Sequence, residues 1–309
     1  MKKVVVFGGN GFIGKHLVRK LSKYYYVLVA DIDVYTIEEI KNVSYIACNF
    51  TEQVDFSSLL QDMDFVFHLV CTILPEDGTD NFDEEIRENV FSTIRLLDCM
   101  KAFPKQKLYF ISSGGTVYGN GSKTQRESDL TLPICKYGLI KDFTEKILEL
   151  YSLMHGISYY AIRLANPYGT KIRPGQQQGL IPILTDCVLN NKEFHVWGNG
   201  ENVRDYIHID DAIRAIFALL NYDGTRRIFN IGSGKGCSIN GVIELLEKII
   251  GQPYRNLVHK PARLCDVLHS QLDISLVTSI TGWSPEISLE EGLLRLIRQY
   301  DPNFIRKKV

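Results

Sequence analysis

The stretch Val4-Val5-Val6-Phe7-Gly8-Gly9-Asn10-Gly11-Phe12-Ile13-Gly14 decides the fold of the N-terminal half. Its apolar residues predict a buried strand, and the amphipathic segment 12–22 predicts a helix. Between them Gly8 permits a tight turn, Gly11 lets the backbone approach a pyrophosphate, and Gly14 lets the helix pack against the strand. The N–H groups and partial positive charge at the helix N-terminus suit phosphates, which indicates a dinucleotide site.

An acidic residue at the expected spacing indicates which dinucleotide binds. A second predicted strand, 27–30, runs into Asp31, which lies 17 positions after Gly14. There the carboxylate can accept hydrogen bonds from the adenosine ribose hydroxyls. Because it would also repel the 2′-phosphate of NADP, the sequence favours NAD. The alternative is that Asp31 is only a solvated loop residue.

Short apolar runs alternate with amphipathic segments as far as residue 168. Strict alternation of this kind predicts an α/β fold, a doubly wound parallel sheet with helices on both faces. The expected strands are 4–7, 27–30, 45–47, 65–69, 108–111 and 159–164, and the expected helices are 12–22, 82–102 and 136–155.

The pattern changes after Pro167, where a loop is expected at 169–179. We expect a dinucleotide-binding domain at 1–168, to which the chain returns around 204–232, and a smaller C-terminal α/β lobe at 169–309 that holds the substrate. The elements expected there are helices at 180–189, 238–250 and 289–300, a helix capped by Asp210 or Asp211, a strand at 193–197 before the turn Gly198-Asn199-Gly200, and a strand at 227–231 belonging to the first sheet.

Composition excludes several classes of protein. The 309 residues are 45% hydrophobic and 23% charged with a formal net charge of −1, which provides no field to attract nucleic acid or a membrane surface. No apolar run approaches the ~20 residues of a membrane span, and the N-terminal apolar run is too short for a signal peptide. The seven cysteines, at 48, 71, 99, 135, 187, 237 and 265, are too widely spaced for a zinc site or a disulfide framework, so we expect thiols in a reducing cytoplasm and no metal.

A candidate catalytic pair opens the third predicted helix. Tyr137 and Lys141 are four residues apart and therefore share one helical face. A lysine ammonium beside a phenol would lower the pKa of the tyrosine, and an oxidised nicotinamide would act in the same direction. Such a tyrosine can act as the general base toward a substrate hydroxyl while a hydride leaves the carbon. Without further context, this spacing is common in surface pairs.

Six motifs in order make the assignment specific. They are 8–14, Glu88-Asn89-Val90, Ser112-Ser113-Gly114-Gly115-Thr116-Val117-Tyr118-Gly119, Tyr137-Gly138-Leu139-Ile140-Lys141, Arg163-Leu164-Ala165-Asn166-Pro167-Tyr168-Gly169 and Val203-Arg204-Asp205-Tyr206-Ile207-His208-Ile209-Asp210-Asp211. The chain thereby resembles the extended short-chain dehydrogenase/reductase family, and within it the nucleotide-sugar epimerases and dehydratases. The resemblance covers residues 4 to about 283 and implies a Rossmann fold, NAD and a nucleotide-sugar substrate.

The resemblance also implies further cofactor contacts. Phe12 and Ile13 belong to the glycine motif, and Leu69 and Asn89 would line the cofactor channel. The pair Asn49-Phe50 stands where the family usually has an aspartate and an apolar residue beside the adenine. An asparagine there can still accept a hydrogen bond from the adenine amino group through its amide oxygen.

One position departs from the family pattern. Many members place a catalytic serine or threonine five residues before the glycine of Val-Tyr-Gly, and here that position is Gly114. Ser113 or Thr116 would then supply the hydroxyl that contacts the reacting oxygen. Alternatively, both side chains only satisfy backbone groups at the end of the strand.

The same segment helps to choose the reaction. Family dehydratases carry Asp-Glu at the positions of Gly115 and Thr116, so dehydration would lack a proton donor here. Oxidation and re-reduction of a sugar C4 hydroxyl need no such pair, which favours an epimerase. The alternatives are a net oxidoreductase that releases NADH and a dinucleotide-sensing protein without catalysis. Gly114 gives the last idea some support, but Tyr137 and Lys141 argue against it.

The resemblance places the nucleotide sugar against the C-terminal half. Arg204 and Arg263 are candidates for the diphosphate, because a guanidinium offers a planar fork of donors. In the family pattern Arg-x-x-Asp, Asp266 would contact the nucleotide ribose. Asn166 would contact the phosphate and Leu180 the uracil. Simple solvation of Arg263 and ordinary core packing of Leu180 are the alternatives.

The residue four positions after Asp266 bears on the sugar itself. In UDP-hexose 4-epimerases a tyrosine there excludes N-acetyl groups at C2, whereas a small residue admits them. The position is Ser270 here, so we expect N-acetylated and plain UDP-hexoses to fit. The family also dimerises through a four-helix bundle, and helices 82–102 and 136–155 carry enough apolar surface for a homodimer. Packing against the chain's own sheet would explain part of that surface.

Overall fold

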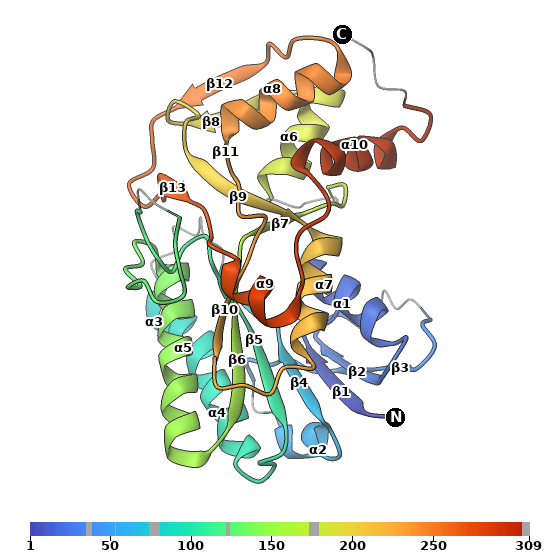
Figure 1. Cartoon of the computed structure of the whole chain (residues 1–309), viewed down its shortest axis with the longest axis vertical. Helices are drawn as coiled ribbons and strands as arrows, with labels where there is room; N and C mark the ends of the chain where they lie inside the picture. The colour runs from blue at the N-terminus through green and yellow to red at the C-terminus, as the bar shows by residue number, and fades with distance from the viewer. Residues whose placement is uncertain (35–38, 53, 74–80, 122–123, 173–178, 305–309) are drawn as a thin grey trace. The chain divides into compact units, whose positions relative to one another are not determined.

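The computed structural model describes residues 1–34, 39–52, 54–73, 81–121, 124–172 and 179–304. Its main element is a seven-stranded sheet in the order β10-β6-β5-β4-β1-β2-β3 (Figure 1). The expected α/β Rossmann architecture is therefore confirmed, including the return of the chain through β10. The strands are β1 (Lys3–Phe7), β2 (Tyr26–Asp31), β3 (Val43–Ala47), β4 (Phe65–His68), β5 (Lys107–Ser113), β6 (Ser158–Leu164) and β10 (Ile228–Ile231).

The order in which strands are added to the sheet reverses between β1 and β4. The chain runs outward through β1, β2 and β3 and then returns to place β4 on the other side of β1, with parallel pairing throughout this part. Because parallel crossovers are right-handed, the helices that follow β1 and β4 lie on opposite faces. Ligands of open α/β sheets bind at the carboxyl ends of the strands beside such a switch point. Gly8 and Leu69 are the first residues after these two strands.

The glycine turn is tightly packed at this point. Gly8 has a φ of +79°, which side chains rarely tolerate, and its N–H donates to Ala30 O at 3.0 Å. A Cβ on Gly14 would lie 2.4 Å from Gly8 O, because α1 (Phe12–Leu21) begins directly against the turn. Both glycines are therefore required by the backbone geometry that exposes the α1 N-terminus.

The helices of the sheet follow the predicted periodicity with one exception. Helix α5 (Lys136–His155) has the expected bounds and ends at Gly156, whose φ is +71°. The predicted helix 82–102 is instead three segments, because five residues take the wider π-helical turn. The segments are α3 (Phe82–Ile86), η1 (Arg87–Phe91) and α4 (Ser92–Met100), and a short α2 (Phe56–Leu60) precedes β4. Figure 1 shows α4 and α5 side by side along the sheet.

The chain forms two compact units. The first unit consists of Met1–Ser113, Cys135–Arg163 and Ile216–Phe229, and the second of Gly114–Ile134, Leu164–Ala215 and Asn230–Val309. The return segment of the first unit lies within the expected 204–232. Residues 114–134 and 164–168, which we expected in the dinucleotide-binding domain, belong to the second unit.

The second unit contains short strands and longer helices. Three residues of β9 pair with β11 and two with β13, while β7 pairs with the other end of β9 and β12 pairs with β8. The elements are β7 (Asn166–Tyr168), α6 (Leu180–Leu189), β8 (Phe194–Trp197), β9 (Val203–His208), α7 (Ile209–Leu219, which continues into the first unit), β11 (Gly236–Ser238), α8 (Ile239–Ile250), β12 (Leu257–Lys260), β13 (His269–Ser270), α9 (Ser275–Thr281) and α10 (Leu289–Tyr300).

One expected helix cap is wrong. Helix α7 begins at Ile209, so Asp210 and Asp211 both lie in its first turn and neither is the cap. Asp211 instead accepts hydrogen bonds from the backbone N–H groups of Glu286 and Ile287, at 3.1 and 2.8 Å. Of the expected loop 169–179, residues 173–178 lie outside the described part of the chain.

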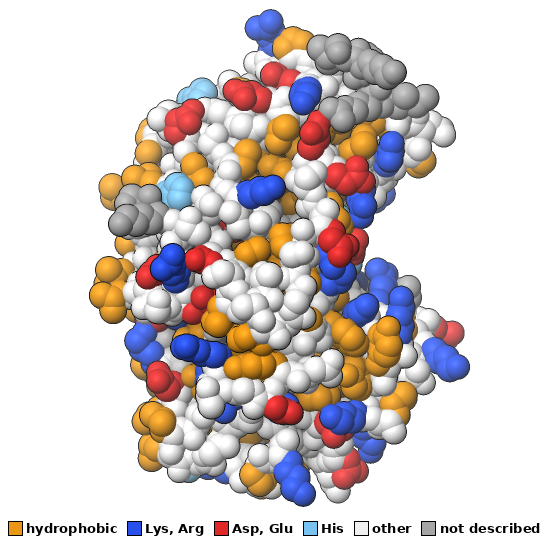
Figure 2. All heavy atoms as spheres, in the orientation of Figure 1, with side chains coloured by type: hydrophobic (Ala, Val, Ile, Leu, Met, Phe, Trp, Pro, Cys, Tyr) orange, Lys and Arg blue, Asp and Glu red, His pale blue; other side chains and the backbone are white. Residues whose placement is uncertain are grey.

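Charged side chains of both signs are mixed on the surface drawn in Figure 2, and no cysteine is crosslinked. Figure 2 shows Lys and Arg side chains interspersed with Asp and Glu over the face drawn. None of the seven cysteines forms a disulfide, and all seven lie in the described part of the chain. Among the described residues there is no acidic, histidine or cysteine cluster that could hold a metal ion, and no helix is long and apolar enough to cross a bilayer.

Candidate active site

Asp31 lies beside the glycine turn, as its spacing predicts. It is the last residue of β2, and its carboxylate accepts a hydrogen bond from the backbone N–H of Asn10 at 2.8 Å. A second hydrogen bond comes from the N–H of Asp33 at 3.1 Å. The structure thus brings the turn, the α1 N-terminus and a half-buried carboxylate together at the carboxyl ends of β1 and β2.

Asn49 and Phe50 follow β3 but differ in what they can reach. The amide oxygen of Asn49 accepts hydrogen bonds from the N–H and the hydroxyl of Thr51, at 3.3 and 2.9 Å. Both lone pairs of that oxygen are therefore used within the loop. The Phe50 ring is 3% exposed and packs 5.3 Å from the Phe7 ring, so it belongs to the core of the first unit.

Asn89 fastens the segment that follows β4 and Leu69. It lies in η1, where its amide oxygen accepts from Thr72 N–H at 3.0 Å and its amide nitrogen donates to the Thr72 hydroxyl at 2.8 Å. The same nitrogen donates to Glu85 O at 2.8 Å. Asn89 therefore holds the Thr72 segment against the π-helical turn, a geometry that is often found at functional sites.

His68 is a buried residue of this region that the sequence analysis did not single out. Its Nε2 lies 2.9 Å from the Thr93 hydroxyl, which itself donates to Asn89 O at 2.6 Å. Nε2 must therefore carry the proton and donate to Thr93, and Nδ1 has no hydrogen-bond partner among the described residues. Burial, and to a lesser extent the Lys141 charge, lowers the pKa of His68 to about 3, so the ring is neutral.

The predicted catalytic pair lies at the start of α5, against the end of β5. Cys135 caps the helix, with its Sγ accepting from Gly138 N–H at 3.4 Å. Lys141 is 4% exposed, donates to Ile111 O at 2.9 Å, and holds its ammonium 5.6 Å from the centre of the Tyr137 ring. The Ser113 hydroxyl, one of the two candidates, hydrogen-bonds the Tyr137 phenol.

The acidity of Tyr137 differs from the sequence expectation. Burial raises the pKa of the phenol above its ordinary value, and the nearby Cys71 and Cys135 thiols raise it further. The hydrogen bond from Ser113 acts in the opposite direction but is outweighed. Proximity to Lys141 alone is therefore insufficient, because taking the phenolate out of water is the larger effect.

A buried ion pair continues the same face of α5. Glu145 is four residues beyond Lys141, and its carboxylate accepts from Arg163 Nε at 3.0 Å and Nη2 at 2.7 Å. The Ser112 hydroxyl donates to the same carboxylate. Arg163 ends the part of β6 in the first unit, so this contact joins α5 to two strands. The sequence analysis missed it, although Arg163 opens one of the recognised motifs.

The second unit holds the remaining residues that the sequence analysis assigns to the sugar. Thr116 is half-buried, and Gly114 donates its N–H to Leu164 O at 2.8 Å. Ser270 is 4% exposed in β13, and its hydroxyl donates to Gly114 O at 3.3 Å. The structure thus joins the predicted sugar-sizing residue to the position at which the usual hydroxyl is missing.

The candidates for the nucleotide occupy three parts of this unit. Arg204 lies in β9, where its Nη1 donates to Val203 O at 2.9 Å, and Asn166 is half-buried in β7 beside it. Arg263 stacks on the Trp197 ring at 4.2 Å, and Asp266 N–H donates to Arg263 O at 3.3 Å. Leu180 packs against the core of the second unit.

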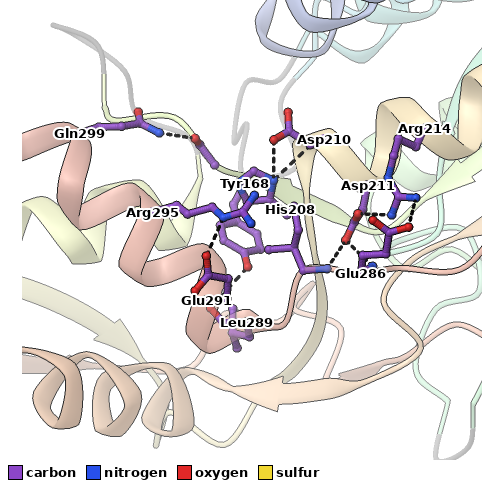
Figure 3. Close-up of polar contacts among 12 residues, drawn as sticks. Tyr168, His208, Asp210, Asp211, Arg214, Glu286, Leu289, Glu291, Arg295 and Gln299 are labelled. Atoms are coloured by element: carbon purple, nitrogen blue, oxygen red, sulfur yellow. Dashed lines mark hydrogen bonds and ion pairs between the residues drawn. The ribbon is translucent and has the colours of Figure 1, made fainter. Parts of the chain in front are cut away.

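The last part of the Val203–Asp211 motif serves the fold of this unit. Figure 3 shows His208 between Tyr168 and Asp210, with Nδ1 accepting from Asp210 N–H at 3.3 Å. Asp211 is fully buried and forms an ion pair with Arg214, with 2.6 Å between Oδ1 and Nη2. Together with its bonds to the 286–287 backbone, this arrangement fastens α7 to the segment before α10. Motif membership therefore marks structural residues as well as candidate ligand contacts.

Comparisons with known proteins agree with this arrangement. Residues 4–232 match the family described as the NAD dependent epimerase/dehydratase family. The chain is similar to a putative UDP-glucose 4-epimerase of Methanocaldococcus jannaschii, with 32% identity over 302 residues that cover 95% of this chain and 97% of the relative. It is also similar to the dTDP-4-dehydro-6-deoxyglucose reductase of Escherichia coli, with 30% identity over 311 residues and 96% of each chain covered.

The fold has close counterparts among solved structures. The UDP-glucuronic acid 4-epimerase from Bacillus cereus, solved in complex with UDP-glucuronic acid and NAD, superposes with a TM-score of 0.87. Its identity to this chain is 28%, and the match covers 96% of this chain and 99% of that one. The similarity therefore extends through both compact units.

Buried neutral His68 predicts sensitivity to acid. Its pKa is about 3 in the folded chain and near 6.5 in the unfolded chain, so below pH 6.5 the unfolded state binds the additional proton and the free energy of unfolding falls. Between pH 7 and 4.5 the free energy of unfolding of the wild type should fall by about 2.5 kcal/mol more than that of His68→Gln. Denaturant unfolding at both pH values measures this difference, whatever the variant's absolute stability.

Thr93→Ser provides the matched control, because it keeps the His68 ring and a hydroxyl beside its Nε2. Thr93→Ser should retain the wild-type dependence of stability on pH. An equal dependence in His68→Gln and the wild type would contradict the assignment of a neutral buried imidazole.

Proposed function

Because the chain belongs to the NAD-dependent epimerase/dehydratase family, we propose that it is a nucleotide-sugar 4-epimerase acting on UDP-hexoses and UDP-N-acetylhexosamines. The observation that carries the proposal is the group formed by half-buried Tyr137 with buried Ser113 and Lys141 at the end of β5. That group can remove a proton from a sugar hydroxyl. Oxidation at C4 requires, beyond that group, only a hydride acceptor, which NAD would supply.

The turn between β1 and α1 fits the family's cofactor. A Cβ on Gly8 would lie 3.1 Å from Val70 N, and the tight approach of Gly14 leaves the α1 N-terminus open for a pyrophosphate. Asp31 would accept a hydrogen bond from an adenosine ribose hydroxyl in place of the one from Asn10 N–H. NAD held there would supply the hydride acceptor for the oxidation and the hydride donor for the reduction. Phe12, Ile13, Leu69 and Asn89 would complete the channel, with Asn49 and the Phe50 backbone near the adenine.

Tyr137 is the general base of the proposed reaction. It takes the proton of the C4 hydroxyl as the C4–H bond breaks, which leaves a 4-keto sugar. Lys141 is held beside the ring by Ile111 O, so its charge stabilises the phenolate. When the keto sugar presents its other face, Tyr137 returns the proton to the oxygen and the C4 configuration is inverted.

Ser113 is the better candidate for the catalytic hydroxyl. It lies one residue before Gly114, and its hydroxyl forms a hydrogen bond with the Tyr137 phenol. A hydroxyl in that position can contact the sugar O4 as well. Thr116 belongs to the second unit and stays the alternative.

The second unit supplies the proposed nucleotide contacts. Arg204 and Arg263 would bind the diphosphate, Asp266 the ribose, Asn166 a phosphate oxygen and Leu180 the uracil. A UDP-sugar is supported by the UDP-glucuronic acid bound to the Bacillus cereus enzyme. Ser270 is small and buried, and its hydroxyl is directed at Gly114 O, to which it donates a hydrogen bond. This leaves room for an N-acetyl group at C2.

The second candidate function is a net nucleotide-sugar reductase. It is favoured by the 30% identity to a dTDP-4-dehydro-6-deoxyglucose reductase. Such an enzyme would use the same Tyr137 and Lys141 but would exchange its cofactor after each turnover. A growth or loss of NADH absorbance in step with product distinguishes it from an epimerase.

We propose also that the chain forms a homodimer through α5. Leu139, Phe143, Leu150 and Met154 follow one face of this helix and are 46%, 47%, 51% and 65% exposed. Phe91 of η1, 51% exposed, adds to the apolar surface. Exposed apolar stripes of this kind are typical of interfaces rather than of free surfaces.

The first prediction concerns substrate and product. Purified protein should convert UDP-glucose and UDP-N-acetylglucosamine into their 4-epimers, with no net change of NADH absorbance, because hydride leaves and returns within one cycle. Chromatography of UDP-, dTDP- and GDP-sugar panels measures this. Efficient turnover of UDP-glucose with negligible turnover of UDP-N-acetylglucosamine would refute the role of Ser270.

The second prediction concerns the catalytic hydroxyls. Tyr137→Phe should lose about 10²–10⁴-fold in kcat and still retain NAD, because only the proton transfer is removed. Ser113→Ala should lose roughly 10- to 150-fold, the value of a hydrogen bond to a charged oxygen. Thr116→Val is the matched control and should stay near the wild type. The reverse ranking of Ser113 and Thr116 would transfer the role to Thr116.

The third prediction concerns assembly. Wild-type protein should sediment at twice the chain mass of 35.2 kDa, and Phe143→Glu should shift it toward the monomer because a carboxylate would be buried in the interface. Leu130→Glu changes an exposed leucine of the second unit and should leave the dimer intact. A wild-type monomer at micromolar concentration would rule out the interface.

A further inference from the structure

Trp197 is an exposed aromatic residue at a fixed position in the second unit. Side chains along β8 alternate, so Phe194 and Val196 enter the core while Trp197 faces outward with 36% of its surface exposed. The pairing of β8 with β12 places Trp197 opposite Lys260, and Gly198 N–H donates to Lys260 O at 2.9 Å. The backbone on both sides of the ring is therefore held in register.

Arg263 lies over this ring. It is three residues beyond the end of β12, and its guanidinium carbon is 4.2 Å from the centre of the Trp197 ring. A turn closed by Asp266 N–H and Arg263 O, at 3.3 Å, follows directly. The strand pairing and the stack thus restrain the position of Arg263 from two directions.

Stacking is compatible with anion binding by the same side chain. The five N–H donors of a guanidinium lie in its plane, whereas the ring contacts its face. A phosphate bound at the edge of the plane therefore does not compete with the tryptophan. An arginine already ordered by stacking also loses less conformational freedom when it binds.

We infer that Trp197 is a positioning residue that orders Arg263 for the diphosphate of the nucleotide. This inference rests on the proposed function, because it takes a nucleoside diphosphate as the ligand of Arg263. It goes beyond that function by assigning a role to a residue outside the recognised motifs. Trp197 acts through Arg263, so its contribution should vanish when Arg263 is absent.

A double-mutant cycle tests the inference. The variants are Trp197→Ala, Arg263→Ala, the double variant, and Trp197→Phe as the matched control that keeps a ring. Calorimetric titration of the NAD-bound protein with UDP, dTDP and GDP gives the affinity for the tightest of the three. We expect Trp197→Ala to weaken binding roughly 2- to 30-fold, the range for loss of a cation–π contact, and Trp197→Phe to lose less.

The cycle should show full coupling. Trp197→Ala should have no further effect in the Arg263→Ala background, and the NAD content should not change in any of the variants. Equal effects of Trp197→Ala in both backgrounds would overturn the inference, because Trp197 would then act independently of Arg263.

Fluorescence tests the contact without any nucleotide. The chain has 2 tryptophans, and the difference between wild-type and Trp197→Phe spectra isolates Trp197 from Trp283. Arg263→Ala should alter that difference spectrum; an unchanged spectrum would overturn the stack. Nucleotide binding that Arg263→Ala leaves intact overturns this inference alone. No binding by the wild type would overturn the proposed substrate class with it.

Discussion

The contact between Glu145 and Arg163 is the one on which the candidate catalytic site depends. Each residue is 4% exposed, so both charges have left water, and their bidentate pairing, together with the hydrogen bond from the Ser112 hydroxyl to Glu145, offsets that loss. Removing one partner of such a pair typically costs about 3–5 kcal/mol, because the other charge remains buried. The pair fixes both the position and the rotation of α5 over β5 and β6.

The rotation of α5 determines the chemistry. Tyr137, Lys141 and Glu145 follow one another at intervals of four residues, so they share a face of the helix. Once Glu145 is held, Lys141 meets Ile111 O and Tyr137 meets Ser113. A second network links His68, at the end of β4, through Thr93 to Asn89, and thereby fixes η1 against β4. The Glu145–Arg163 pair is neutral overall and the His68 ring is neutral, so Lys141 carries the remaining positive charge beside Tyr137.

The sequence was most informative where one residue type is required by local geometry. The glycine turn, the end of β2 at Asp31 and the full length of α5 follow from backbone sterics and helical periodicity. Tertiary effects were not predictable. The π-helical turn of η1 interrupts an apolar periodicity that predicts one continuous helix. The pairing of Glu145 with Arg163 joins residues 18 apart, and no local sequence pattern predicts that they meet. The raised pKa of Tyr137 depends on burial, which local spacing does not report, and β13 is only two residues long.

The buried phenol of Tyr137 has a consequence for how molecules in a population behave. Burial raises the pKa of the phenol above its ordinary value, and the hydrogen bond with Ser113 does not offset that rise. For the proposed reaction, the additional positive charge must come from an oxidised cofactor bound beside the ring. A molecule without that cofactor would then have no activity, rather than a reduced rate. Measured turnover would therefore count occupied molecules, and a preparation that loses cofactor would lose active copies in proportion while each remaining copy keeps its full rate.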